Sequence, residues 1–273
     1  FSQAVVDGGA LSSVVDVNDD APLTLISGTI GSALRGDDRS TINIQGGATG
    51  TNGFLVSPDA TLNVVAGTIG RDFLIQQGTV NMVGGAFEQN AGLVNDLGGI
   101  DPTFNMKGGA LGPAFRCYDG ILNMAGGVTG TFKLGSPTGD GSGVALNLYV
   151  KALFIDGDRV NLTKNAPTLI AERGEKLLVA ELVNGDAFTL TLRETGNLAE
   201  DYARQGAVIN AILHCPTDFD NDGTIDLNDL LAVLGNFGTT ESSPADTDND
   251  GDTDLADLLS LLGDFGTTCT LPF

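Results

Sequence analysis

Two acidic stretches near the end of the chain have the residue types and spacing of a metal-binding loop. They begin at Asp218 and Asp246 and read DFDNDGTIDLNDLLAVLGNFG and DTDNDGDTDLADLLSLLGDFG. In each stretch oxygen-bearing residues fall at loop positions 1, 3, 5, 7, 9 and 12, and a glycine stands at position 6, where the loop turns sharply. Such a loop wraps about six or seven oxygens around Ca²⁺. The sequence therefore predicts two calcium sites: Asp218, Asp220, Asp222, Thr224, Asp226 and Asp229, then Asp246, Asp248, Asp250, Asp252, Asp254 and Asp257.

Two other interpretations of these stretches are weaker. An ordinary acidic turn would not keep the same offsets and the same glycine in both copies, and carboxylates at this density repel each other without a cation. Mg²⁺ is the lesser alternative because it seldom accepts a cage made only of protein oxygens.

An amphipathic helix is expected after each loop. Leucines recur at i, i+3, i+4 and i+7, which places them on one apolar stripe of a helix. They are Leu227, Leu230, Leu231 and Leu234 in the first copy, and Leu255, Leu258, Leu259 and Leu262 in the second. Gly235 and Gly263 are expected to end the helices. Pro216 and Pro244 stand two residues before the loops, so no helix is expected there.

This pair of loop-plus-helix units resembles the type I dockerin module over about residues 215–269. The resemblance implies an EF-hand-like module that binds two Ca²⁺ and docks onto a cohesin domain. It places the partner-contacting residues at loop positions 10 and 11, which are Leu227 with Asn228 and Leu255 with Ala256. The Ser-Thr pair familiar from cellulosomal dockerins is absent from these positions.

Three cysteines bear on the compartment. Cys215 and Cys269 bracket the acidic module, which predicts a disulfide, and a disulfide together with calcium points to an extracellular protein. The remaining Cys117 is expected to be a buried repeat residue, the alternative being an intermolecular disulfide. The chain begins at Phe1, as a secreted protein does after loss of its signal peptide, although a boundary drawn within a longer chain would give the same start.

The first half of the chain is repetitive. Six segments align without gaps, each with an apolar–polar–apolar triplet followed by a bend of small residues: LTLISGTIG (23–31), INIQGGATG (42–50), LNVVAGTIG (62–70), VNMVGGAFE (80–88), FNMKGGALG (104–112) and LNMAGGVTG (122–130). A unit of this length cannot bury its own apolar face, so it must stack on its neighbours. Stacking predicts a β-solenoid, or parallel β-helix, with Leu62, Val64, Val80 and Met82 inside. A β-sandwich or jelly roll is the rival fold.

The central polar residue of the triplet is Asn in five of the six segments: Asn43, Asn63, Asn81, Asn105 and Asn123. In a stack these side chains can form a ladder of amide hydrogen bonds; a ligand-binding face is the alternative. The repeats resemble those of autotransporter-like secreted bacterial β-helix proteins over about residues 22–150, which implies a fold and not an activity.

The predicted fold is mainly β, in four parts. Residues 1–21 form strands outside the repeat, 22–143 the solenoid, 144–214 a strand-rich cap, and 215–273 the small α-helical calcium module. The Gly/Ser-rich run at 135–143 is expected to be a loop.

Charge and composition limit the function. The net charge is −22, and residues 215–273 contain 13 acids and no Lys or Arg, which disfavours nucleic acid and anionic membranes as partners. No run of 18 apolar residues exists to span a membrane. The single His214 has no nucleophile constellation around it in the sequence and is expected to be a linker residue. We therefore expect no enzyme.

The expected function is that of an extracellular calcium-binding structural protein that self-assembles into a filament, tube or surface layer. The alternatives are a dockerin-bearing protein anchored to a cohesin partner, a passive adhesin, and a calcium-dependent polysaccharide lyase. A lyase would draw its base from cations such as Arg35, Arg71, Lys107 and Arg116.

Overall fold

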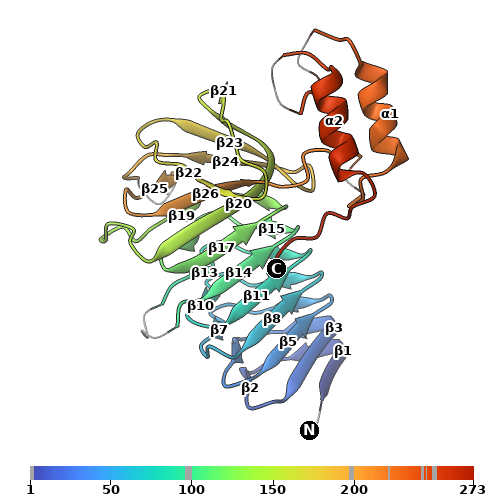
Figure 1. Ribbon diagram of the computed structural model, residues 1–273. Helices are drawn as coiled ribbons and strands as arrows, with labels where there is room; N and C mark the ends of the chain where they lie inside the picture. Colours follow the sequence, from blue (N-terminus) through green and yellow to red (C-terminus); the bar gives the residue numbers. More distant parts are fainter. Residues whose placement is uncertain are drawn as a thin grey trace.

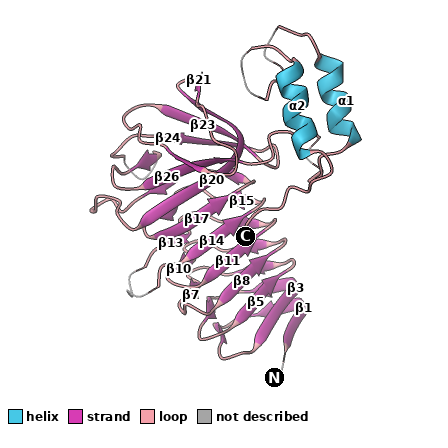
Figure 2. Ribbon diagram, in the orientation of Figure 1, coloured by secondary structure: helices cyan, strands magenta, loops and turns pink. Residues whose placement is uncertain are grey.

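A computed structural model describes residues 3–95, 100–196, 200–220, 222–240, 243, 245–247 and 251–273. Parallel strands dominate it, and two helices follow at the end of the chain (Figures 1 and 2). The architecture is β-solenoid-like, because successive turns of the chain, here called rungs, add strands in register to the same two sheets. We refer to these rungs together as the parallel stack, and to residues 215–273 as the helical module.

Each inner rung contributes a longer strand, and most add a short second strand, to the larger sheet. The longer strands are β1 (Ala4–Leu11), β3 (Pro22–Ile30), β5 (Thr41–Ile44), β8 (Thr61–Val64), β11 (Thr79–Met82), β14 (Thr103–Met106), β17 (Gly120–Met124), β20 (Val144–Ile155) and β26 (Val208–Leu213). The short ones are β6 (Ala48–Thr49), β9 (Thr68–Ile69), β12 (Ala86–Phe87), β15 (Ala110–Leu111) and β18 (Val128–Thr129).

A smaller sheet forms another side of the stack. Its strands, all parallel, are β2 (Val15–Val17), β4 (Leu34–Gly36), β7 (Phe54–Leu55), β10 (Leu74–Ile75), β13 (Gly92–Leu93), β16 (Phe115–Cys117), β19 (Phe132–Leu134) and β25 (Tyr202–Ala203). The interior between the two sheets is a continuous apolar core.

The asparagines of the repeat form the predicted ladder. Asn43, Asn63, Asn81, Asn105 and Asn123 are aligned in register. From Asn63 onward, each side-chain Nδ2 donates to the Oδ1 of the asparagine in the rung before it over 2.8–3.0 Å. Asn147 and Asn210, which lie outside the six aligned segments, extend the same chain of hydrogen bonds. The ladder confirms the structural interpretation of the asparagine row.

Replacing Asn105 with alanine is expected to destabilise the stack by about 2 kcal/mol. The change removes one donated and one accepted side-chain hydrogen bond, each contributing about 1 kcal/mol. Urea denaturation followed by far-UV circular dichroism measures the loss. The exposed Asn161, which is not part of the ladder, supplies the control Asn161→Ala. Equal effects of the two substitutions would mean that the ladder adds no stability.

The predicted inward residues are buried. Leu62, Val64, Val80 and Met82 are fully inaccessible, as the period-2 alternation requires. A column of aromatic rings runs up the same core, with neighbouring centroids 5.4–6.0 Å apart: Phe73, Phe87, Phe104, Phe115, Phe132 and Phe188. Cys117 is buried in β16, as expected, and burial raises the pKa of its thiol.

The glycines of the bend are required by the close stacking of the rungs. Gly47 has φ +74°, and a Cβ there would lie 2.5 Å from the carbonyl oxygen of Gly28 in the preceding rung. Gly67 repeats this, 2.6 Å from the carbonyl oxygen of Gly47. Any larger residue would both strain the backbone and push the rungs apart.

The segment before the repeat is itself a rung. β1 pairs in parallel with β3, Ala4 opposite Leu23 and Leu11 opposite Ile30, and β2 pairs in parallel with β4. The expectation that residues 1–21 belong to no repeat unit is therefore wrong. Val5 stands where inner rungs have asparagine, so the segment lacks the ladder residue that marked the others.

The far end of the stack combines further rungs with antiparallel strands. β20 pairs in parallel with β17 and β26, so part of the predicted cap continues the stack. The other strands there are β21 (Asp158–Arg159), β22 (Pro167–Leu169), β23 (Leu177–Leu182) and β24 (Ala187–Thr191). β23 runs antiparallel to β20 and β24, and β22 runs antiparallel to β26. β22 thus covers the last rung.

The helical module contains α1 (Leu227–Asn236) and α2 (Leu255–Asp264) beyond the β20–β26 end of the stack (Figure 1). Gly235 and Gly263 lie inside these helices and do not end them. The left-handed residues after the helices are Gly238 and Gly266, with φ +80° and +79°, which is the usual place for glycine after a helix.

Candidate metal centre

The first acidic loop brings three carboxylates together. Asp218, Asp220 and Asp222 each place one oxygen within 4.8 Å of the others. The loop is shaped by its own backbone: the Gly223 N–H donates to Asp218 Oδ2 over 3.2 Å, and the Thr224 N–H donates to Asp222 Oδ1 over 2.7 Å. The predicted ligands at positions 1, 3 and 5 therefore converge.

The second loop repeats this geometry where the structure describes it. The Gly251 N–H donates to Asp246 Oδ2 over 3.2 Å, as its counterpart does in the first loop. Asp248 and Asp250, predicted at positions 3 and 5, lie outside the described residues. Asp252 at position 7 is half-buried and follows the positive-φ Gly251.

The carboxylates at positions 9 and 12 join each loop to its helix. Asp226 is the N-cap of α1, and its Oδ1 accepts from the Asn228 N–H over 2.8 Å. The buried Asp229 accepts from the Phe219 N–H over 2.6 Å and from the Asp226 N–H over 2.8 Å, so it ties the start of the loop to the helix. Asp254 and Asp257 make the same capping box on α2.

The donor set fits a hard divalent cation. Asp246 is almost fully buried, and its Oδ1 accepts no hydrogen bond from the described part of the chain. A buried carboxylate oxygen without a partner is costly unless a cation neutralises it. Oxygen-only donors on a glycine-turned loop suit Ca²⁺ better than metals that prefer nitrogen or sulfur.

The two loop–helix units form one fold by exchanging backbone hydrogen bonds. The Ile225 N–H of the first loop donates to Thr267 O after α2, and the Gly238 N–H after α1 donates to Thr253 O of the second loop. The shared core is small: Ile225, Val233, Ala245 and Leu261 are buried in it, and Leu230 and Leu258 pack against it.

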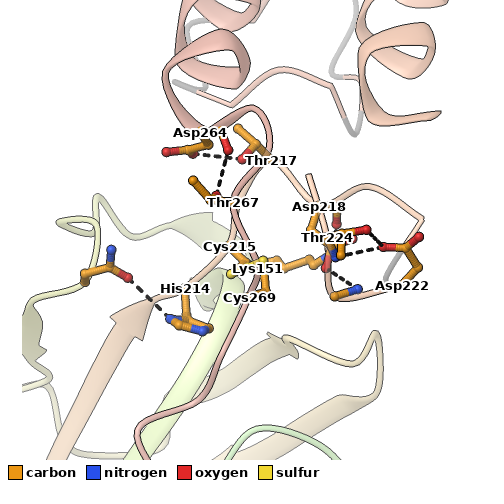
Figure 3. Close-up of a disulfide and its surroundings, with 12 residues drawn as sticks. Lys151, His214, Cys215, Thr217, Asp218, Asp222, Thr224, Asp264, Thr267 and Cys269 are labelled. Atoms are coloured by element: carbon orange, nitrogen blue, oxygen red, sulfur yellow. Dashed lines mark hydrogen bonds between the residues drawn. A yellow bond between two sulfur atoms is a disulfide. The ribbon is translucent and has the colours of Figure 1, made fainter. Parts of the chain in front are cut away.

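The predicted disulfide between Cys215 and Cys269 is present, with the Cα atoms 5.8 Å apart (Figure 3). It joins the strand that leaves the stack to the segment after α2. Beside it, Thr217 Oγ1 donates to Asp264 Oδ2 over 2.9 Å. Both ends of the helical module are therefore fixed at the same point.

Lysines of the stack reach the acidic module. The ammonium group of Lys151 on β20 donates a hydrogen bond to the backbone carbonyl of Asp218 (Figure 3). Lys164 forms an ion pair with Asp264. Burial lowers the pKa of Lys151, while Asp218, Asp220 and Asp229 oppose this shift. The sequence pattern did not identify these two lysines. The signal that could have found them is the charge imbalance of residues 215–273, which contain 13 acids and no Lys or Arg and so favour contacts with cations elsewhere in the chain.

Six of the eight leucines of the predicted stripes face solvent. Leu230 and Val233 pack in α1, and Leu258 and Leu261 in α2. The remaining large apolar side chains of both helices and their caps are 45–59% exposed: Leu227, Leu231, Leu234, Phe237, Leu255, Leu259, Leu262 and Phe265. We call these eight residues the exposed helix faces. Of the predicted stripe leucines, only Leu230 and Leu258 therefore contribute to the core of the module.

The four cations considered for a lyase make separate contacts in the described chain. Arg35 pairs with its near neighbour Asp37, and Arg71 with its neighbour Asp72. Arg116 donates to the Asn90 carbonyl, and Lys107 lies over the Phe273 ring, 5.4 Å from its centroid. His214 faces Asn165, with Nδ1 3.3 Å from Oδ1, and burial lowers its pKa.

The geometry defines a β-solenoid-like stack carrying a disulfide-closed, acidic, two-helix module. Comparison of the chain with models of protein families, with curated proteins and with solved structures finds no match. Among the described residues, no helix has the length and apolar character needed to cross a membrane.

Proposed function

We propose that this chain is an extracellular calcium-binding structural protein that self-assembles through its parallel stack and its helical module. Two Ca²⁺ ions would be held by the paired loops, the dockerin-like units of the sequence. The convergent carboxylates of the first loop and the unpartnered Asp246 Oδ1 of the second support this. Calcium would neutralise part of the module's acidity and fix the loop–helix junctions.

One observation carries the self-assembly: the helical module presents apolar side chains suited to a partner. These are the exposed helix faces, which lie at equivalent positions of α1 and α2. Exposed apolar surface of this kind is a usual site of association. The Cys215–Cys269 disulfide supports an oxidising, extracellular setting.

Sedimentation velocity and negative-stain electron microscopy of the full chain test this proposal. In millimolar CaCl₂, rising protein concentration is expected to give larger species and ordered particles. A concentration-independent monomer under these conditions, at both low and moderate salt, would contradict self-assembly.

A cohesin-like partner is the second candidate function. It is favoured by the exposed helix faces, which occupy the same positions in both units and include Leu227 and Leu255, two of the four residues that the dockerin resemblance assigns to partner contact. A pull-down with cohesin domains in calcium tests it. Leu231→Asp with Leu259→Asp is expected to abolish capture, whereas Val65→Asp, equally exposed on the stack, is the matched control. No capture by wild type would reject this candidate. A lyase is not proposed, because no described arrangement favours it.

Lys151→Met is expected to tighten calcium binding at the first loop about fivefold. The substitution keeps an unbranched side chain of nearly the same length but removes a positive charge beside Asp218. That charge would repel a bound cation. Isothermal titration calorimetry of the apo protein measures the change. Lys164→Met, which removes a contact to Asp264 outside the loops, is the control. Weaker binding in Lys151→Met would show that the lysine positions the loop more than it repels the ion.

A further inference from the structure

We infer that a group of cations and tyrosines on the outer side of the smaller sheet binds a small tetrahedral oxyanion, for which sulfate is the probe. The group consists of Arg116, Lys133, Tyr118 and Tyr202, and we call it the cation cluster. It belongs to the parallel stack and not to the helical module. The inference therefore does not depend on the proposed calcium binding or self-assembly.

Strand alternation brings the two cations together on one side of the sheet. The residues that flank Arg116 in β16 and Lys133 in β19 belong to the apolar core, so Arg116 and Lys133 point away from it. The two are register partners in neighbouring parallel strands, and Tyr202 of β25 is the partner of Lys133 on the other side. Because adjacent strands lie about 4.8 Å apart, Lys133 stands directly between a guanidinium and a phenol.

The ammonium group of Lys133 is buried without a partner. The residue is 1% exposed, and its Nζ makes no hydrogen bond with the described chain. Arg116 is half-buried and donates from Nη2 to the Asn90 carbonyl, whereas its buried Nε donates to no group of the described chain. Burial and the positive charge of Arg116 both lower the pKa of Lys133. Two adjacent cations thus lack a compensating carboxylate among the described residues.

The tyrosines add hydroxyl donors to this positive surface. Burial and the neighbouring Tyr118 hydroxyl raise the pKa of Tyr202, so the Tyr202 hydroxyl keeps its proton at neutral pH and can donate it. Arg204 lies over the Tyr202 ring, 5.3 Å from its centroid, and contributes further positive charge. The cluster therefore combines cations and hydrogen-bond donors, which is the chemistry that recognises an anion.

An oxyanion compensates the charges of this cluster. An unpaired buried ammonium is costly, and adjacent cations repel each other. A water molecule would accept hydrogen bonds but would leave both charges uncompensated. An anion between Lys133 Nζ and Arg116 Nε replaces this repulsion with two attractions, and its several oxygens suit the planar guanidinium better than a halide does. Because Lys133 is almost fully buried, the ligand is a free ion and not a group carried on a polymer.

Isothermal titration calorimetry of the full chain with sodium sulfate, at constant ionic strength and fixed calcium concentration, tests the site. We expect one saturable sulfate per chain. Lys133→Met keeps an unbranched side chain without the charge and should weaken binding at least about tenfold. The exposed Lys176 supplies the matched control Lys176→Met, which should bind sulfate as wild type does.

Arg116→Gln is the second variant. Its amide can still donate to the Asn90 carbonyl but carries no charge, so the same weakening is expected. A parallel titration with sodium chloride distinguishes an oxyanion site from a halide site. Equal sulfate affinity in Lys133→Met and wild type, or chloride binding as tightly as sulfate, would overturn the proposal.

Nuclear magnetic resonance of the wild type locates the ion without any substitution. The backbone amide resonances of Arg116 and Lys133 are expected to shift with sulfate in step with the calorimetric saturation. Shifts confined to other residues would place the ion elsewhere and overturn the site. The absence of saturable sulfate binding by wild type would overturn it as well, while leaving the proposed calcium binding and self-assembly untouched.

Discussion

Chelation of calcium is expected to unfold α1 and α2 while the parallel stack stays folded. The helical module has a core of a few apolar side chains, and it concentrates 13 acids without a Lys or Arg of its own. A ligand at about one hundred times its Kd stabilises a folded state by about 2.7 kcal/mol, so two sites contribute about 5 kcal/mol. This is of the order of the whole stability of a small domain. The stack has its own continuous core and ladder.

Far-UV circular dichroism with EGTA and then excess CaCl₂ measures this. The helical signal of the two ten-residue helices should disappear with EGTA and return with calcium, while the strand signal persists. The Asp246→Asn variant should need more calcium to recover its helicity, because the buried carboxylate is lost. Simultaneous loss of the helical and strand signals would mean that the folding of the stack depends on the helical module. An unchanged helical signal would mean that calcium does not stabilise the helical module.

Replacing both Cys215 and Cys269 with serine is expected to destabilise the helical module by about 4 kcal/mol. The disulfide joins residues 54 apart in the sequence, and closing a loop of that length removes about this much chain entropy from the unfolded state. The module cannot compensate from its small core. Its unfolding midpoint in urea, followed by the helical signal in calcium, should fall sharply.

Cys117→Ala is the matched control for this prediction. Cys117 is free and buried in the stack, so its substitution should lower the stability of the stack and leave the helical module unchanged. If the double serine variant shifts both transitions equally, the stack and the module unfold as one unit and the disulfide does not act locally.

The regular parts of the fold could be predicted from the sequence because they repeat. Six aligned segments with a central polar residue and a small-residue bend specify stacking, and stacking specifies that Asn81 meets Asn63 and Asn105. Three end rungs were missed for the same reason, one at the start of the described stack and two at its far end. β1 carries the Gly-Gly bend without the asparagine, while β20 and β26 carry Asn147 and Asn210 without the bend. Each of these three rungs therefore carries only one of the two sequence features, the bend or the asparagine, that identify the inner rungs.

Part of the geometry of the candidate metal centre could be predicted from the sequence. The offsets of the aspartates and the glycine turn are local properties, and the structure brings Asp218, Asp220 and Asp222 together as that spacing indicates. The capping roles of Asp226 and Asp229 are local too. The contact between Lys151 and the Asp218 carbonyl is not, because it joins residues 67 apart.

By itself the sequence determined which residues repeat, which acids recur at the same offsets in both loops and which cysteines bracket the module, since each depends on short-range spacing. The tertiary structure alone decided which leucines of α1 and α2 face solvent and that β22 runs along the last rung of the described stack. Helical periodicity places Leu227 and Leu230 on one stripe, but only the position of the second helix selects which of them is buried. Likewise, strand propensity does not say which strand lies beside β26, because β22 reaches it only through long-range pairing.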